Sequence, residues 1–115
     1  MNTEQLEALK TADVYMDNLK GGIINIAEAI QEGKEQEAIN IIPQVVDGMQ
    51  WIIDVIELTK SVQKEKIKLE EINEHIEEMI EAFENEDFIL VGDLFNYEIL
   101  PILEEAHKQI KVCIA

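Results

Sequence analysis

Residues 87–103 read Asp87-Phe-Ile-Leu-Val-Gly-Asp-Leu-Phe-Asn-Tyr-Glu-Ile-Leu-Pro-Ile-Leu103, and this stretch decides what kind of fold the chain adopts. It is typical of a helix, yet apolar residues occupy nearly every side of it. A helix that only covers a core needs one apolar stripe, whereas a helix that is apolar all round is buried by several neighbours or by another chain. The stretch therefore predicts a helical protein that contacts another protein, but it indicates neither a partner nor a chemistry.

Before this stretch, apolar residues recur three and four positions apart, which is the pattern of helices packed side by side. The first helix is predicted over about 3 to 31, with its stripe at Leu9, Ala12, Met16, Leu19, Ile23, Ile26 and Ile30. The stripe passes in phase through Gly21-Gly22, which indicates a close helix crossing or a tolerated weak point; the alternative is a break at Lys20. Gly33 suits the left-handed position that ends many helices.

Two more helices are predicted between Gly33 and Asn85. The stripe of the second is Ala38, Ile42, Val45, Met49, Ile52 and Ile56, and the stripe of the third is Leu69, Ile72, Ile76, Met79 and Phe83. Pro43 predicts a kink or short break near residues 39–42, because proline removes a backbone hydrogen bond and crowds the preceding turn. We place the junction between these helices at Thr59 to Lys64, where Thr59 or Ser61 can cap a new helix. The alternative is one long rod.

The fourth helix is predicted from about 88 to 112, capped by Asp87 and kinked at Pro101. At ~100° per residue, one face packs into the bundle and carries Phe88, Val91, Phe95, Ile99, Ile102, Ala106 and Cys113. Four residues point away from that face and form the predicted interaction surface: Ile89, Leu90, Tyr97 and Leu100. Adjacent helices of the same protomer, a second copy of the chain, or a foreign helix or peptide could cover them.

Short connections predict antiparallel neighbours. The expected fold is therefore all-α, an antiparallel up-down four-helix bundle with kinks at Pro43 and Pro101, in a single domain over residues 1–115.

The charge of the chain excludes several classes of partner. The net charge is −16 and all nine basic residues are lysines, so nucleic acid and anionic membrane surfaces are disfavoured. No apolar run approaches the ~20 residues of a membrane span, and no secretory leader is evident, so we expect a cytoplasmic protein. A basic patch of Lys60, Lys64, Lys66 and Lys68 indicates a solvated helix end or a contact with an acidic partner.

The sequence gives little support for catalysis. A di-iron bundle needs two Glu-x-x-His elements, but only Glu104 with His107 fits, and both are predicted on the outer side of the last helix. We therefore expect no metal, no cofactor and no enzyme activity. Glu98 borders the core face and is predicted either as a buried polar residue that anchors a ligand or sets the helix register, or as a partly exposed residue beside Pro101.

The stretch Asn85 to Glu104 resembles the ending of a family of short acidic helical proteins from low-GC Gram-positive bacteria, which carry an Asp-Leu-Leu/Phe-x-Tyr-Glu-x-x-Pro core. Ala38-Ile-x-x-Ile42 and Gly48-Met-Gln-Trp51-Ile-Ile also fit, so the resemblance covers about 25 to 110. That family is uncharacterised: the resemblance implies a helical fold, singles out Tyr97, Glu98 and Pro101, and supplies no activity. A weaker similarity links the chain to flagellar export chaperones in length, helix count and acidity.

From these observations we expect a non-catalytic protein–protein interaction module that forms a homodimer through the fourth helix or binds another protein. The alternative is a chaperone-like bundle that holds a partner helix in an apolar groove. A third hypothesis is a bundle that binds a metal or small ligand around Glu98.

Overall fold

The structure is a computed structural model that describes residues 3–115, and every regular element in that range is helical. The elements are α1 (Thr3–Gln31), α2 (Glu35–Leu58), the short 3₁₀ helix η1 (Lys60–Val62), α3 (Ile72–Glu84), α4 (Phe88–Asp93), η2 (Leu94–Ile99) and α5 (Leu100–Ile114). Because α4, η2 and α5 follow one another without a break, residues 3–115 form four long helical stretches besides η1. The prediction of an all-α fold is confirmed.

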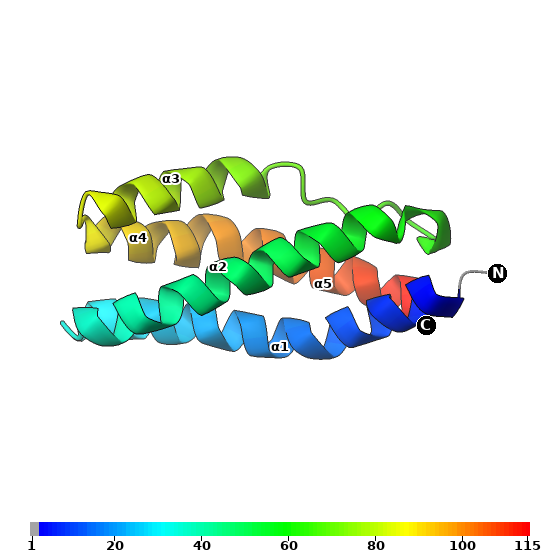
Figure 1. Ribbon diagram of the computed structural model, residues 1–115, viewed down its shortest axis with the longest axis horizontal. Coiled ribbons are helices and arrows are strands. Elements are labelled where there is room, and N and C mark those ends of the chain that lie inside the picture. Colours follow the sequence, from blue (N-terminus) through cyan, green and yellow to red (C-terminus); the bar gives the residue numbers. More distant parts are fainter. Residues whose placement is uncertain (1–2) are drawn as a thin grey trace.

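The four stretches lie side by side in an elongated body of 49 × 22 × 18 Å (Figure 1). In Figure 1 the chain reverses its course at each of the three connections between them. Helix α1 lies against both α2 and α5, and α3 lies against α4 and η2. The buried apolar side chains of all four stretches form one continuous core.

Helix α1 is unbroken through Gly21-Gly22 and ends at the predicted residue. Gly33 adopts φ +77°, Lys34 N–H donates to Ala29 O at 2.7 Å, and Gly33 N–H donates to Ile30 O at 3.1 Å. This pair of bonds satisfies carbonyls that the end of a helix otherwise leaves free.

The two central glycines of α1 differ in their surroundings. A Cβ atom placed on Gly22 would lie 3.0 Å from Val45 Cγ2, whereas one placed on Gly21 would meet no atom within 4 Å. Gly22 therefore lies where α1 and α2 cross closely, and Gly21 is a position where α1 tolerates a residue of low helix propensity.

Helix α2 continues without interruption through Pro43, so the predicted short break is absent. The helix ends at Leu58, and the buried Thr59 closes it by donating its hydroxyl hydrogen to Val55 O at 2.7 Å. Thr59 therefore ends α2 and does not cap the next helix as predicted.

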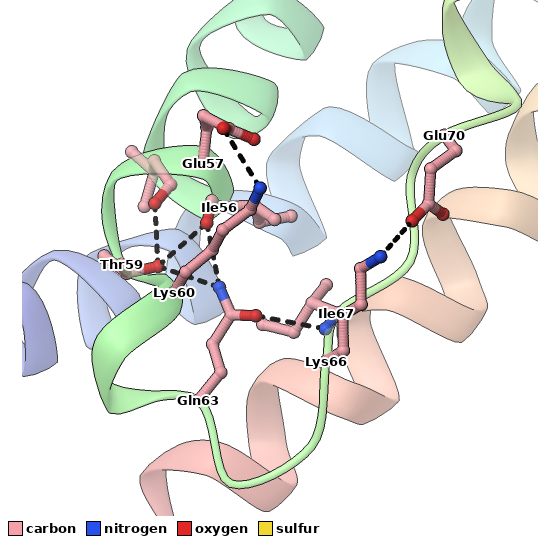
Figure 2. A network of polar contacts seen from close by, with 9 residues as sticks. Ile56, Glu57, Thr59, Lys60, Gln63, Lys66, Ile67 and Glu70 are labelled. Atoms are coloured by element: carbon pink, nitrogen blue, oxygen red, sulfur yellow. Dashed lines mark hydrogen bonds and ion pairs between the residues drawn. The ribbon is translucent and has the colours of Figure 1, made fainter.

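The segment between α2 and α3 is longer than predicted, because α3 begins only at Ile72 and residues 63–71 are not helical. Figure 2 shows how Gln63 fixes the start of this segment. Its amide nitrogen donates to Ile56 O at 2.8 Å, and its amide oxygen accepts Ile67 N–H at 3.1 Å. Ile67 and Leu69 are buried in the core. This non-helical segment rules out the alternative of one long rod.

The turn between α3 and α4 has the same backbone hydrogen bonds as the turn after α1, but its left-handed residue is Glu86 and not a glycine. The third helix is predicted to end at Asn85, and Asn85 is the residue that follows the last turn of α3 as its C-cap. Glu86 then takes the left-handed conformation at φ 57°, and Asp87 N–H donates to Ala82 O at 2.9 Å. Asp87 Oδ1 accepts Leu90 N–H at 3.3 Å, so its predicted role as the cap is confirmed.

Candidate functional site

The fourth helical stretch widens into a π-helix, η2, at Leu94–Ile99. Leu100 N–H donates to Phe95 O, five residues earlier. Pro101 has no N–H to donate and lies directly after the π turn, as the second residue of α5. Local π turns inside α-helices occur frequently at functional sites, which draws attention to the residues around η2.

The π turn keeps four core residues with an unusual sequence spacing on one face of the helix. Val91, Phe95, Ile99 and Leu103 stand four residues apart and are all fully buried. In a regular α-helix, residues four apart drift by ~40° at each step. The wider turn absorbs this drift, and every residue after η2 is displaced by about one position relative to an unbroken α-helix.

This displacement overturns two expectations about the last helix. Leu103, and not Ile102, is the buried residue of its turn. His107, predicted on the outer side, is 3 % exposed and bonds through Nε2 to Asp13 Oδ1 at 2.8 Å. Glu104 is exposed as predicted, so the two residues of the Glu-x-x-His element point in different directions.

Asp13 is the shared acceptor of a small polar cluster between α1 and α5. Lys111 Nζ lies 2.9 Å from the same Oδ1 atom that binds His107. The hydrogen bond from Lys111, with a weaker one from His107, holds the pKa of the Asp13 carboxyl below its usual range despite its partial burial. Sequence analysis missed this cluster because no local pattern connects Asp13 to residues that far along the chain.

Three of the four residues of the predicted interaction surface are exposed in the protomer. Ile89 is 75 % exposed, Tyr97 is 69 % exposed and Leu90 is 43 % exposed, whereas Leu100 is partly covered. Neighbouring helices of the same chain therefore do not wrap the first three. With Asp93, which stands three or four residues from each, they lie on the outward side of α4 and η2; we call these four residues the α4–η2 face.

A cleft of about 390 Å³ adjoins this face, between the last turns of α1 and α4–η2. Its lining is Ala27, Ile30, Gln31, Ile89, Gly92, Asp93, Asn96 and Tyr97. A Cβ atom on Gly92 would lie 3.6 Å from Ile30, an ordinary contact, so the floor of the cleft is closely packed. Asp93 forms no ion pair with any residue between Thr3 and Ala115, so its charge faces outward unpaired.

Glu98 is not buried, which corrects the first of its two interpretations. Its side chain is 51 % exposed, and His75 Nε2 lies 3.8 Å from its Oε2 atom. The π turn keeps Phe95 and Ile99 on the core face and leaves Glu98 at the edge, against α3. The alternative interpretation, a partly exposed residue beside Pro101, fits this position.

The other titratable and nucleophilic side chains of residues 3–115 that were considered in the sequence do not gather at one site. Within residues 3–115, no group of three or more His, Cys, Asp or Glu residues could hold a metal ion. Cys113 is buried, and Ser61 donates to Gln5 at 2.7 Å. In the predicted basic patch, Lys60 pairs with Glu57 at 3.0 Å near the end of α2, and Lys66 pairs with Glu70 at 2.9 Å in the non-helical segment before α3; all four side chains are exposed.

Comparison with known proteins adds a family and no activity. A model of the family described as "Domain of unknown function (DUF8042)" matches residues 7–109. No curated protein and no solved structure matches the chain. None of the helices in the described part of the chain is both long enough and apolar enough to cross a membrane.

Proposed function

This chain belongs to the DUF8042 family, whose function is unknown, and we propose that it is a non-catalytic protein-binding module that forms a homodimer through the α4–η2 face. The observation that carries the proposal is the exposure of Ile89 and Tyr97, about two turns apart beside one cleft. Clustered large apolar side chains on a protein surface mark interfaces, because leaving them in water is unfavourable.

Symmetry strengthens this argument. In a two-fold homodimer each residue of the face is buried twice, once in each protomer. Fully burying one Ile, Leu or similar side chain contributes about 1.5–3 kcal/mol. Two copies of Ile89, Leu90 and Tyr97 therefore supply a gain comparable with the ~4–15 kcal/mol that association costs in lost freedom. We expect a weak to moderate dimer.

The proposal includes the shape of the scaffold. We expect an up-down bundle in which α2 bends at Pro43 and the fourth stretch bends at Pro101, because each proline crowds the carbonyl of the preceding turn. Residual dipolar couplings of the amides before and after each proline measure such a bend. Couplings that fit a single straight axis through both halves would rule it out.

Sedimentation velocity at micromolar concentration tests the homodimer. The wild-type protein should sediment as a dimer, and Ile89→Glu or Tyr97→Glu should convert it to a monomer. Leu58→Glu is the matched control, because Leu58 is 72 % exposed and lies at the far end of α2. A wild-type monomer, or an unchanged mass in both face variants, contradicts the proposal.

A second candidate function is a chaperone-like groove that holds a basic partner helix. Two observations favour it: Asp93 is an unpaired carboxylate in the middle of the α4–η2 face, and the chain carries a net charge of −16. Two copies of the same acidic surface repel each other, whereas a helix with apolar residues on one side and lysines on its flanks complements the face.

Salt separates the two candidates. Sodium chloride screens the repulsion between two acidic protomers and should strengthen the homodimer, but it should weaken the binding of a basic helix. A synthetic amphipathic helix of leucine and lysine is the probe, and the same helix with glutamate for lysine is the control. If both peptides bind equally, or if Asp93→Asn leaves the binding of the lysine peptide unchanged, the basic-partner function is excluded.

A further inference from the structure

A second surface, between α1 and α2, carries an aromatic corner. Tyr15 of α1 and Trp51 of α2 have ring centroids 5.4 Å apart and ring planes at 81°. Trp51 is exposed and Tyr15 is half-buried, so both rings reach solvent. In this edge-to-face contact the two nearly perpendicular rings form the two sides of a corner at the surface.

Gly48 is the residue that makes this corner possible. A Cβ atom at position 48 would collide with the Tyr15 hydroxyl and would lie 3.1 Å from Leu19 Cδ1. The absence of a side chain lets Tyr15 lie across α2, one turn before Trp51. The result is a cleft of about 380 Å³ between α1 and α2, lined by Thr11, Tyr15, Gln44, Asp47, Gly48 and Trp51.

Asp47 supplies a charge to the cleft. It forms no ion pair or hydrogen bond through its side chain with any residue that the structure describes. No lysine lines the cleft, and the net charge of −16 adds a negative potential over the whole surface. An anionic ligand is therefore repelled, and a cationic ligand is attracted.

We propose that this cleft binds a quaternary ammonium group. The negative face of an aromatic ring attracts a cation, and the attraction is strongest for Trp. A metal ion such as Mg²⁺ or Ca²⁺ needs several oxygen ligands, which one carboxylate does not supply. A lysine ammonium is strongly hydrated and gives up its water reluctantly. A trimethylated nitrogen spreads its charge over methyl groups that pack against Tyr15 and Trp51 while Asp47 balances the charge.

Fluorescence titration tests the proposal, since Trp51 is the single tryptophan of the chain and lies in the site. Choline chloride should change the Trp51 emission saturably. Its neutral isostere, 3,3-dimethylbutan-1-ol, has the same shape without the charge and should bind about fivefold or more weakly. Trimethyllysine amide is titrated in the same way. Tighter binding of choline indicates that the natural ligand is a small molecule, and tighter binding of trimethyllysine amide indicates a modified lysine side chain.

Variants locate the site. Asp47→Asn should weaken choline binding several-fold, whereas Glu37→Gln, which removes one exposed charge nearer the start of α2, should not change it. Gly48→Ala should abolish binding by displacing Tyr15, and its circular dichroism spectrum checks that the fold persists. The proposal is overturned if neither ammonium compound gives a saturable change, if the neutral isostere binds equally well, or if Glu37→Gln weakens binding as much as Asp47→Asn.

Discussion

At the scale of single residues, the two central glycines of α1 act differently although they are adjacent. Gly22 faces Val45 across a close helix crossing, and Gly21 faces open space. Their sequence pattern is the same, so the sequence left both interpretations open. Only the rotation of α1 against α2 decides which glycine is needed.

Replacing Gly21 by alanine should stabilise the protein by about 0.5–1 kcal/mol, because alanine loses less backbone entropy in a helix and nothing obstructs its methyl group. Gly22→Ala should stabilise the protein less than Gly21→Ala, or should destabilise it, because the added methyl group presses on Val45. Urea unfolding measures the stability of both variants: a shift of the urea concentration at the unfolding midpoint, with an unchanged m-value, reports a change in the free energy of unfolding. A larger gain for Gly22→Ala than for Gly21→Ala would contradict the crossing described here.

Glu86 is the only non-glycine residue between Thr3 and Ala115 with a positive φ, at 57°. A left-handed conformation costs an ordinary residue roughly 1 kcal/mol, and glycine avoids this cost. Glu86→Gly should therefore raise the free energy of unfolding by up to about 1 kcal/mol, as measured by thermal or urea unfolding. Gly33→Ala, at the matching position after α1, should lower it by a similar amount; if the two changes have the same sign, the two turns are not equivalent.

The Asp13 cluster gives a prediction that depends on pH. Asp13→Ala removes the acceptor of the buried His107 and should destabilise the protein by about 1–3 kcal/mol at neutral pH. Since Lys111 and His107 lower the pKa of Asp13 in the folded state, its contribution is present above the unfolded pKa of about 4 and is lost as the pH falls through the lower folded pKa.

Urea unfolding of the wild type and of Asp13→Ala at pH 7 and near pH 3 measures this dependence. The difference between the two proteins should shrink at the acidic pH. If the difference is independent of pH, the carboxylate charge of Asp13 does not stabilise the fold.

At the scale of elements, the π-helix η2 explains why the fourth stretch was only partly predictable. The exposure of Ile89 and Leu90, before η2, follows from the regular spacing of ~100° per residue, and Tyr97, inside η2, is exposed as predicted. Beyond η2 the register is displaced, so the burial of His107 could not be predicted. The signal that could have been used is the run of four-residue spacings from Val91 to Leu103, together with Asn96 and Pro101 within the same run.

The connection before α3 was mispredicted for a different reason. Ile67 and Leu69 are buried while Lys66 and Lys68 are exposed, an alternation with a period of two that is typical of extended chain. Leu69 was instead assigned as the first residue of the apolar stripe of the third helix, whereas α3 begins only at Ile72. The predicted junction begins at the right place, because α2 ends at Leu58. The lack of glycine and proline in this region hid the late start of α3 at Ile72.

If η2 is a one-residue insertion into an α-helix, removing one exposed residue from it should be tolerated. Deleting Asn96 together with Pro101→Ala should leave a folded protein with a continuous α-helix, because the core residues on both sides return to one face. Deleting the exposed Asn25 from α1 is the control and should unfold the protein, because it rotates half of the apolar stripe away from the core by ~100°. Circular dichroism and urea unfolding compare the two deletions. Equal loss of structure in both contradicts this description of η2.

At the scale of the whole molecule, the acidic charge opposes folding as well as self-association. The outer face of α3 carries Glu74, Glu77, Glu78, Glu81 and Glu84, all exposed. Like charges three or four residues apart on a helix destabilise it by a few tenths of a kcal/mol each.

Moderate salt should therefore raise the melting temperature of the protein. Salt at about 0.1 M screens surface charges beyond ~10 Å, and the repulsion on this chain outweighs its few exposed ion pairs. Differential scanning calorimetry on dilute protein from low salt to about 0.1 M NaCl measures the effect. A melting temperature that falls steadily over this range would mean that attractive pairs dominate.

The central claim is that the α4–η2 face is where this protein meets a second copy of itself. Amide NMR spectra across a dilution series, from micromolar to near-millimolar protein, test this claim most directly because they locate the contact residue by residue. The account predicts concentration-dependent shifts concentrated at residues 89–97 and at the end of α1, and their loss in Ile89→Glu. Spectra that do not change on dilution, or changes confined to other surfaces, would contradict it.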